Sequence, residues 1–360
     1  FLTKCSRIFR QNIDTKIITI TGSCGKTTLK EMMGNILKKI SNTTFSPKSF
    51  NNKYGVPVSL MNLRQNDDFG VLEAGMDRKG EIDNLTKIIK PDLGVITNIS
   101  YAHSKNFKNI KLIADAKAEI IQNINTNGAL ILNADDKFFK YHKDIAYKKK
   151  LNVLSFGIRN KLSFVKLIKI KKINKKKYEL FIRVGKFIIT FYSLNKNNSN
   201  LYNILATLVV VNLYSNLRQL RKDIFLNLKI PEGRGDISKI KTKDKNIFLV
   251  DETYNSNPLS LKTAIENYDK IKSNKSKKIM ILGDMLELGN HSIKQHKLIS
   301  KIINKTNIDK VFVIGKYIKE TFKGLKTDKK AKILTNKSDI IELINKDLDN
   351  NDYLMIKGSN

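Results

Sequence analysis

The sequence is poor in several residue types that define particular protein classes. It has two cysteines and no tryptophan among 360 residues, which excludes the disulfide framework of small secreted domains and fits a reducing cytoplasm. Five prolines are too few for a collagen-like or low-complexity chain. The most apolar stretch, Leu205 to Leu213, is interrupted by Thr207 and Asn212. It is less than half of the roughly 20 residues that a membrane-spanning helix needs, so we expect no membrane insertion.

Acidic residues are also scarce: 33 Asp and Glu stand against 67 Lys and Arg, which gives a formal net charge of +34. Such a chain attracts phosphates, so nucleic acid is a candidate partner. However, only nine of the 67 basic residues are arginine, the residue best suited to bidentate recognition of phosphates and bases. The lysines are spread along the whole chain, without an arginine stripe or an aromatic stacking platform. We therefore expect no specific nucleic-acid partner.

The length and the 41% hydrophobic content predict two domains, each with its own core. In the first, residues 1–230, apolar strands alternate with helical patterns, which is typical of a mostly parallel sheet. Short antiparallel hairpins are expected within residues 151–194. A linker is predicted at Lys229–Asp236, and the alternating strands and helices of residues 231–360 predict a Rossmann-like α/β domain.

Hydrophobic periodicity gives approximate positions for these elements. The predicted strands are Lys16–Ile20, Phe69–Leu72, Leu93–Thr97, Ala129–Leu132, Phe164–Ile170, Tyr178–Val184, Phe187–Tyr192, Ile247–Val250, Lys278–Leu282, Lys310–Ile314, Lys332–Leu334 and Tyr353–Ile356. The predicted helices are Lys26–Ile40, Lys111–Ile124, Asn200–Tyr214, Pro258–Ile271, Ile293–Ile303 and Ser338–Lys346.

A glycine-rich loop lies between the first predicted strand and the first predicted helix. It consists of Thr21, Gly22, Ser23, Cys24, Gly25, Lys26, Thr27 and Thr28. Backbone N–H groups and the positive end of a helix hold phosphate oxygens in this context. Lys26 would reach the terminal phosphates and the Thr27 hydroxyl would ligate Mg²⁺, although Ile20 stands where the common phosphate loop has another Gly. Cys24 has no neighbouring base in the sequence, which favours a small loop residue over a nucleophile.

This loop resembles the Thr-Gly-x-x-Gly-Lys-Thr-Thr signature of the Mur ligases and the folylpolyglutamate synthases. Other motifs are similar, in matching order over nearly the whole chain, to those of the Mur ligases that add D-alanyl-D-alanine. They are Phe50-Asn51-Asn52, Gly55-Val56-Pro57, Glu73-Ala74-Gly75-Met76, Gly80-Glu81-Ile82, Thr97-Asn98-Ile99, Ala102-His103, Ala116-Lys117 with Glu119, Asn133-Ala134-Asp135-Asp136, Asp251 with Tyr254-Asn255-Ser256-Asn257-Pro258, Leu282 to Gly289, and Lys357-Gly358-Ser359. Each motif alone is weak, but their common order is specific.

The resemblance implies a cytoplasmic, monomeric ligase of peptidoglycan precursor synthesis. Such an enzyme uses ATP and two Mg²⁺ ions to join D-alanyl-D-alanine to a UDP-MurNAc-tripeptide through an acyl phosphate. Family members also have an N-terminal UDP-binding domain, for which the residues before Ile17 leave no room, so we expect this chain to lack it. The alternatives are another Mur ligase, a folylpolyglutamate synthase or, from a different class, a cationic nucleic-acid-associated ATPase. The sequence has no Asp-Asn-Pro-Arg signature of the diaminopimelate-adding ligases.

Three residues of the first predicted domain are implied to hold metal together with Thr27. Glu73 ends an apolar strand, where a carboxylate opposite the phosphate loop suits Mg²⁺. His103 follows the next strand, at the sheet edge where α/β proteins bind ligands, and the resemblance makes it a ligand of the second metal. Lys117 by itself is one more surface lysine. By resemblance it is carbamylated, and the resulting anion helps to hold the second Mg²⁺.

The resemblance also implies the nucleotide and substrate contacts. Asn203, in the pattern Asn200-x-x-Asn203, would contact adenine, and both asparagines occupy N-cap-like positions of the predicted helix. Arg234 would contact the nucleotide and Asp251 the ribose, although both could be ordinary linker and strand-end charges. The family commonly has His before the first Asn, where this chain has Ser199. The implied substrate-binding residues are Asn51, Asn52, Tyr254, Asn255, Asn257 and Lys357.

Overall fold

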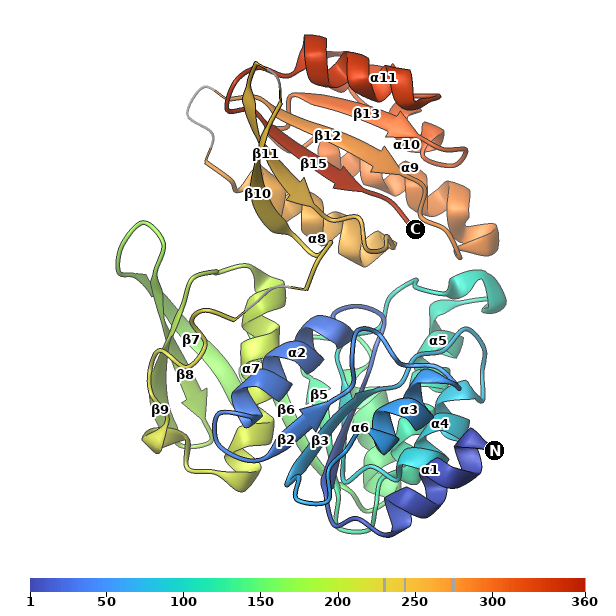
Figure 1. Cartoon of the computed structure of the whole chain (residues 1–360), viewed down its shortest axis with the longest axis vertical. Helices are drawn as coiled ribbons and strands as arrows, with labels where there is room; N and C mark the ends of the chain where they lie inside the picture. The colour runs from blue at the N-terminus through green and yellow to red at the C-terminus, as the bar shows by residue number, and fades with distance from the viewer. Residues whose placement is uncertain (229–230, 243, 273–275, 360) are drawn as a thin grey trace. The chain divides into compact units, whose positions relative to one another are not determined.

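The computed structural model describes residues 1–228, 231–242, 244–272 and 276–359. The chain forms two compact units, which Figure 1 shows coloured along the sequence. The first contains Phe1–Ile99 and Asn109–Lys229, and the second contains Ser100–Lys108 and Ile230–Asn360. A short segment after the fourth strand of the first unit therefore folds with the second.

The described residues of the first unit form a nine-stranded sheet. The first seven strands across the sheet, which run from β2 at its edge to β7, are parallel to one another, and β8 pairs antiparallel with both β7 and β9. In spatial order they are β2 (Thr43–Phe45), β3 (Phe69–Glu73), β1 (Lys16–Thr21), β4 (Leu93–Ile96), β5 (Ala129–Asn133), β6 (Asn152–Gly157), β7 (Val165–Lys172), β8 (Tyr178–Val184) and β9 (Phe187–Ser193). The predicted combination of a mostly parallel sheet and a hairpin region is confirmed.

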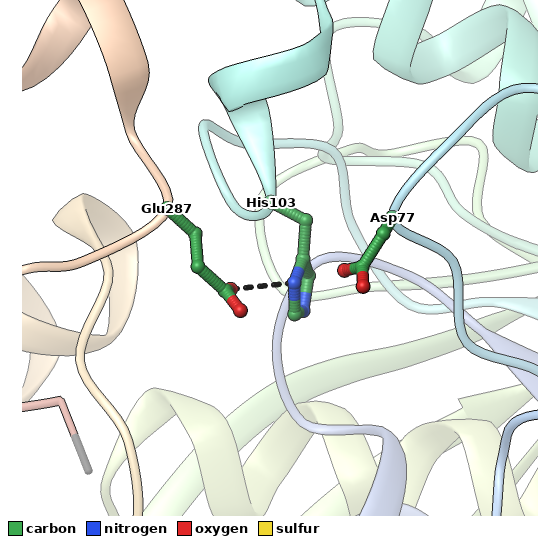
Figure 2. Close-up of side chains that lie close together, drawn as sticks. All are labelled: Asp77, His103 and Glu287. Carbon is green, nitrogen blue, oxygen red and sulfur yellow. Dashed lines mark ion pairs between the residues drawn. The ribbon is translucent and has the colours of Figure 1, made fainter.

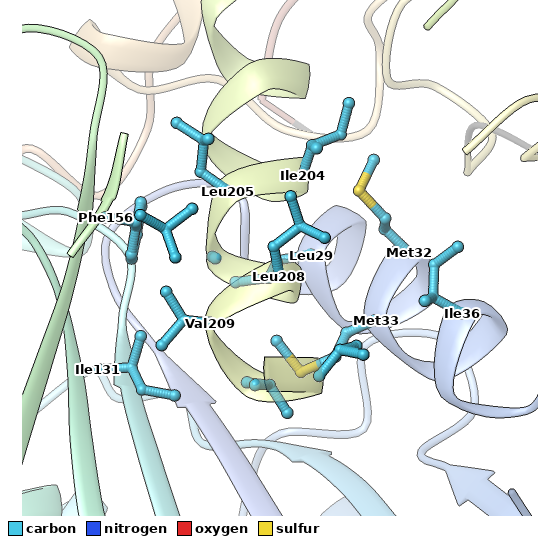
Figure 3. Packing of buried hydrophobic residues seen from close by; sticks show 14 of the residues in the cluster. Leu29, Met32, Met33, Ile36, Ile131, Phe156, Ile204, Leu205, Leu208 and Val209 are labelled. Atoms are coloured by element: carbon cyan, nitrogen blue, oxygen red, sulfur yellow. The ribbon is translucent and has the colours of Figure 1, made fainter. Parts of the chain in front are cut away.

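Helices cover this sheet because its parallel strands are apolar on both faces. They are α1 (Leu2–Gln11), α2 (Lys26–Leu37), α3 (Gly55–Met61), α4 (Glu81–Ile89), α5 (Ile110–Ala118), α6 (Phe139–Lys148) and α7 (Asn198–Tyr214). Figure 3 shows α2 and α7 packed together, with Met33 and Leu208 in the same buried cluster as Ile131 and Phe156 of the sheet. The most apolar stretch of the sequence, Leu205 to Leu213, thus lies within α7, where residues 205–211 are buried and Leu213 is exposed. Among the described helices, none combines the length and the apolar content needed to cross a membrane.

The described residues of the second unit form a six-stranded sheet. Its first strand is antiparallel to the second and the others are parallel. The order is β10 (Asp236–Lys241), β11 (Asn246–Asp251), β15 (Tyr353–Lys357), β12 (Lys278–Gly283), β13 (Lys310–Ile314) and β14 (Lys330–Ile333). The helices are α8 (Pro258–Asp269), α9 (Ser292–Ile303), α10 (Lys319–Lys323) and α11 (Lys337–Glu342).

Strand β12 shows how the second sheet acquires two covered faces. Successive side chains of a strand point to opposite sides. Met280 and Leu282 belong to the core that includes α8 and α9 residues, whereas Ile279 and Ile281 belong to a separate core with Leu343. A continuous apolar strand therefore joins both cores, as expected for the predicted Rossmann-like domain.

Several predicted elements are confirmed with shorter bounds. The helix predicted at Lys111–Ile124 is α5, followed by a 3₁₀ turn at Glu119–Asn123. The helix predicted at Ser338–Lys346 is α11, followed by a π-type turn at Leu343–Asp347. In both cases the apolar periodicity of the sequence continues past the end of the α-helix. The pattern does not distinguish an α-helix from the 3₁₀ or π turn that follows it.

Two predictions about local structure are wrong. The linker expected at Lys229–Asp236 does not include Asp236, because β10 begins there and pairs with β11; its first two residues lie outside the described part of the chain. Asn200 is not at the helix N-cap, because α7 begins at Asn198 after Asn197. Because the residues before and in the first turn of this helix are all polar, the sequence does not show which of them is the capping residue.

Candidate active site

The phosphate loop connects β1 to α2 and requires glycine at two positions. Gly25 has φ of 81° and caps α2, and Gly22 has φ of 142°. A Cβ on Gly22 would lie 1.9 Å from Thr97 Oγ1, so no other residue fits there without a shift. The loop is also tied to the end of β4: Thr97 Oγ1 donates to the Cys24 carbonyl at 2.7 Å, and the Cys24 N–H donates to Asn98 Oδ1 at 3.0 Å.

The lysine and threonine of this loop face different partners. Lys26 Nζ donates to the carbonyl of Gly22 at 3.0 Å, so its ammonium group lies over the loop where phosphates would bind. Thr27 Oγ1 lies 3.1 Å from Ser49 Oγ and 3.3 Å from Glu73 Oε2. The predicted phosphate loop and the predicted strand-end carboxylate are therefore brought together.

The carboxylate of Glu73 is fully buried at the end of β3. Its Oε2 atom accepts a long hydrogen bond from Asn51 Nδ2 at 3.4 Å in addition to that from Thr27. Its Oε1 atom has no hydrogen-bond partner among the described residues. A buried carboxylate oxygen with an unused acceptor is costly. Glu73 and the Thr27 hydroxyl together form an oxygen donor set of the kind that Mg²⁺ prefers.

Lys117, on α5, is not a surface lysine: only 1% of the residue is exposed. Burial lowers the pKa of its amine well below the ordinary value, and the nearby positive charge of Lys26 lowers it further. A neutral amine is the form that can react with carbon dioxide to give a carbamate. The environment of Lys117 thus supplies the protonation state that the expected modification needs.

The asparagines predicted to bind ligands occupy distinct places in the first unit. Asn203 is buried in α7, with its Oδ1 atom 4.0 Å from the place of a Cβ on Gly25, so it borders the phosphate loop. Asn52 Oδ1 accepts from the N–H groups of Tyr54 and Gly55 and shapes the start of α3. Asn200 donates to Ser193 Oγ and is thus engaged within the unit.

In the second unit, the buried ammonium group of Lys357 contacts the loop after β11. Lys357, at the end of β15, is 2% exposed. Its ammonium group donates to Glu252 Oε2 at 3.2 Å, to the Glu252 carbonyl at 3.3 Å and to the Asn255 carbonyl at 2.9 Å. These contacts equal the number of N–H donors on an ammonium. Burial raises the pKa of Glu252, while Lys357 opposes that rise.

The other predicted residues of the second unit surround this loop. The Arg234 guanidinium lies 3.9 Å from the centroid of the Tyr254 ring, and Tyr254 is 45% exposed. Asp251 Oδ1 accepts from the N–H and hydroxyl of Thr253. Asn257 caps α8 through Ser260 in a reciprocal capping box, so part of its role is structural.

His103 belongs to the segment that folds with the second unit. Its Nδ1 atom lies 2.6 Å from Glu287 Oε2. Figure 2 shows the two side chains facing each other, with a dashed line marking the pair. His103 lowers the pKa of the Glu287 carboxyl. The backbone supports the pair, because the Lys105 N–H donates to the Glu287 carbonyl at 2.8 Å. Both residues have positive φ, 52° and 63°, which is uncommon for residues with a side chain.

Sequence reasoning missed four residues of the site: Ser49, Glu252, Glu287 and Lys30, a buried lysine whose Nζ lies 3.9 Å from Glu73 Oε1. Lys30 follows Lys26 by one helical turn, a spacing that places both on one helix face. Glu287 lies inside the motif Leu282 to Gly289, for which the sequence predicted no role of any single residue. Ser49 and Glu252 follow or precede recognised motifs, but nothing in their spacing distinguishes them from other loop residues.

Comparison with known proteins finds matches for both parts of the chain. The family model described as "Mur ligase middle domain" matches residues 20–211, and "Mur ligase, glutamate ligase domain" matches residues 237–360. Two relatives are named UDP-N-acetylmuramoyl-tripeptide--D-alanyl-D-alanine ligase. The one from Buchnera aphidicola is 33% identical over 85% of this chain and 66% of its own length. The one from Rickettsia prowazekii is 30% identical over 99% of this chain and 78% of its own.

Solved structures show the same fold. MurF from Acinetobacter baumannii has a TM-score of 0.87 at 26% identity, covering 99% of this chain and 77% of that one. MurF from Thermotoga maritima, solved in complex with ADP, has a TM-score of 0.84 at 26% identity, covering 99% and 79%. With both of its units matched by family models and with relatives similar over most of its length, this chain belongs to the Mur ligase family.

Proposed function

We propose that this chain carries the ATP-binding and C-terminal parts of an ATP-dependent ligase that joins D-alanyl-D-alanine to a UDP-MurNAc-tripeptide in peptidoglycan precursor synthesis. The observation that carries the proposal is the contact of a phosphate loop with a buried strand-end carboxylate, Thr27 with Glu73. This contact occurs in a chain whose relatives bear the name of that ligase.

ATP is placed by the loop and its lysine. The N–H groups of residues 22–28 and the start of α2 would hold the phosphate oxygens, and Lys26 would neutralise their charge. Asn203 borders Gly25 of the loop, and we propose that it contacts the adenine. Arg234 and Asp251 of the second unit are proposed to contact the nucleotide and its ribose.

Glu73 and Thr27 would hold one Mg²⁺, since they offer an adjacent hydroxyl and a buried carboxylate oxygen that has no hydrogen-bond partner within the residues that the structure describes. We propose that Lys117, as a carbamate, and His103 hold a second ion. Bound Mg²⁺ neutralises charge that develops on the transferred phosphoryl group.

The reaction needs no protein nucleophile. A carboxylate oxygen of the tripeptide attacks the γ-phosphorus of ATP, the bond to the β-bridging oxygen breaks, and ADP and an acyl phosphate form. The amine of D-alanyl-D-alanine then attacks the acyl carbon, and phosphate leaves with the former carboxylate oxygen. This chain contributes positioning and charge neutralisation, which dominate phosphoryl transfer.

Asn51, Asn52, Tyr254, Asn255, Asn257 and Lys357 are proposed to form the substrate region. Lys357 acts there through the loop that it holds, because its ammonium contacts the Asn255 carbonyl and Glu252. We further propose a monomeric enzyme of the cytoplasm, where ATP and the nucleotide-linked precursor are available, without a specific nucleic-acid partner.

The test is phosphate release from ATP by the full protein, given the tripeptide precursor and one candidate amine at a time. We expect release to depend on both the tripeptide and D-alanyl-D-alanine. Release that depends instead on a single amino acid would identify a sister Mur ligase, and release that depends on a folate substrate would identify a folylpolyglutamate synthase. Stimulation by nucleic acid without any amine would contradict the ligase function.

A further inference from the structure

Lys30 is a buried cation that the proposed reaction does not use. It lies on α2, one turn after Lys26, and none of its surface is exposed. A buried ammonium is costly unless it is paired and hydrogen-bonded. Lys30 meets both conditions: it donates to the carbonyls of Ser46 and Lys48, the latter at 2.7 Å, and it lies 2.7 Å from Glu31 Oε1.

The same ammonium group lies 3.9 Å from Glu73 Oε1, the oxygen for which the described part of the chain offers no hydrogen-bond partner. At that distance the two groups attract each other without forming a hydrogen bond. Lys30 therefore keeps a charged carboxylate tolerable in a buried position while leaving the oxygen's lone pairs unused. A direct hydrogen bond would have occupied one of them.

Lys30 also fixes the chain segment that leads to two other groups of the site. Ser46 and Lys48, whose carbonyls it binds, lie in the same short segment as Ser49 and Asn51, and Lys48 directly precedes Ser49. Ser49 lies 3.1 Å from the Thr27 hydroxyl, and Asn51 donates to Glu73 Oε2. One buried ammonium thus connects the phosphate-loop helix, the strand-end carboxylate and the segment of residues 46–51.

We propose that Lys30 is a positioning residue of the metal and phosphate site: it sets the orientation of Glu73 and of the segment carrying Ser49 and Asn51, without touching nucleotide or metal itself. The inference rests on the proposed function, because it assumes that Glu73 and Thr27 hold Mg²⁺. Partners in the second coordination shell typically change metal affinity by about 10- to 100-fold when they are lost.

The experiment measures ADP binding by titration calorimetry on the full protein, with Mg²⁺ and with a chelator. In Lys30→Met, we expect the Mg²⁺-dependent gain in ADP affinity to fall by about tenfold or more, while ADP affinity in chelator changes by less than about threefold. The matched control is Lys38→Met, which removes an exposed lysine at the C-cap of the same helix; its Mg²⁺-dependent gain should equal that of the unmodified protein.

Thermal unfolding of each variant shows whether the fold is kept. If Lys30→Met does not fold, Lys30→Gln replaces it, since an amide can still donate to the Ser46 and Lys48 carbonyls but carries no charge. An unchanged Mg²⁺-dependent gain in a folded Lys30 variant would overturn the inference and leave the proposed function intact. Equal losses of ADP affinity with and without Mg²⁺ would also overturn the inference, because they indicate that the substitution disrupts the phosphate loop itself and not the metal site. If the unmodified protein shows no Mg²⁺-dependent gain, the proposed function itself fails, and the inference with it.

Discussion

Each unit buries a lysine beside a glutamate near the carboxyl edge of its sheet, but the two pairs differ in what they leave available. Lys30 Nζ lies 3.9 Å from Glu73 Oε1 and donates its hydrogen bonds to backbone carbonyls, so Glu73 Oε1 has no hydrogen-bond partner among the described residues. Lys357 donates directly to Glu252 Oε2 at 3.2 Å. The same residue types thus form an open acceptor in the first unit and a closed ion pair in the second. We infer that the first pair serves binding and the second serves the shape of a loop.

The largest effect is expected at the phosphate loop of the first unit. Lys26→Ala and Thr27→Ala should each lower turnover by about a thousandfold, because positioning and charge neutralisation supply most of the catalysis of phosphoryl transfer. Both residues act at the loop and not in the apolar core, so the unfolding temperature should change little. Phosphate release and thermal unfolding are the measurements. Near-normal turnover in either variant would remove the phosphate-loop assignment.

Paired glutamate variants test the comparison itself. Glu73→Gln should lower turnover by about a hundredfold, because the carboxylate is proposed to hold the metal. It should cost little stability, because Lys30 keeps its contacts with Glu31 and with the Ser46 and Lys48 carbonyls. Glu252→Gln should instead lower the free energy of unfolding by about 2 kcal/mol, since a hydrogen bond from a buried ammonium to a charged partner is weakened. The comparison is wrong if both variants lose mainly stability, or if both lose mainly activity. Denaturant unfolding and turnover, measured on the same preparations, separate these cases.

Lys117 offers a smaller, reversible effect in the first unit. Its lowered pKa favours the neutral amine that forms a carbamate. Lys117→Ala should lose most activity, and short carboxylates should restore part of it by occupying the place of the carbamate. The restored fraction is measured as turnover against carboxylate concentration. Full activity of Lys117→Ala would rule out a modified lysine, and loss of activity without any rescue would weaken the proposal. Lys148, the exposed last residue of α6, provides the control. Lys148→Ala should keep normal turnover, and added carboxylates should not change it.

Buried histidines extend the comparison to pH. His296 donates from Nδ1 to the Ser292 carbonyl and accepts at Nε2 from the Met285 N–H, whereas His142 donates from Nε2 to the Ala114 carbonyl. Burial lowers the pKa of both rings. A lowered pKa means that the unfolded chain takes up the proton first, so stability falls as pH drops from the ordinary histidine value, about 6.5, towards the folded value.

Protonation removes the acceptor only in His296, so the second unit should lose more. We expect about 1 kcal/mol of additional acid sensitivity, the typical net contribution of one hydrogen bond, that disappears in His296→Gln but persists in His142→Gln. Denaturant unfolding from pH 7.5 to pH 5 measures it. Equal acid sensitivity of the two variants would show that the tautomer of His296 has no special role.

The sequence predicted element types well where periodicity was long and both faces of a strand were apolar. It missed α3, which contains Gly55 and Pro57, because these residues are typical of loops, although proline is tolerated in the first turn of a helix. It also missed β2, which is three residues long, as well as strands β6 and β10 and helices α1, α4 and α6. Lys117 resembled a surface residue, because its burial depends on packing between elements distant in sequence. The pairing of Lys30 with Glu73, 43 positions apart in the numbering, depends on the same long-range packing.

The smallest effect concerns charge, which both units share. The net charge of +34 comes from lysines along the whole chain, and in the structure many of these lysines are exposed on strands, helices and turns of each unit. Any strongly cationic surface binds polyanions at low salt, so weak attachment to DNA or RNA should occur and should fall steeply with ionic strength. At about 0.15 M salt, where screening limits electrostatic reach to roughly 8 Å, we expect no selective binding to mixed oligonucleotides and no effect of them on phosphate release. Anisotropy titrations across salt concentrations, with and without D-alanyl-D-alanine turnover, make the measurement. Two outcomes would contradict this expectation: tight and sequence-selective binding at that salt concentration, or ATP hydrolysis that nucleic acid stimulates and D-alanyl-D-alanine does not. In either case the positive charge has a function of its own, and the ligase function that the Lys30–Glu73 pair is proposed to serve is wrong.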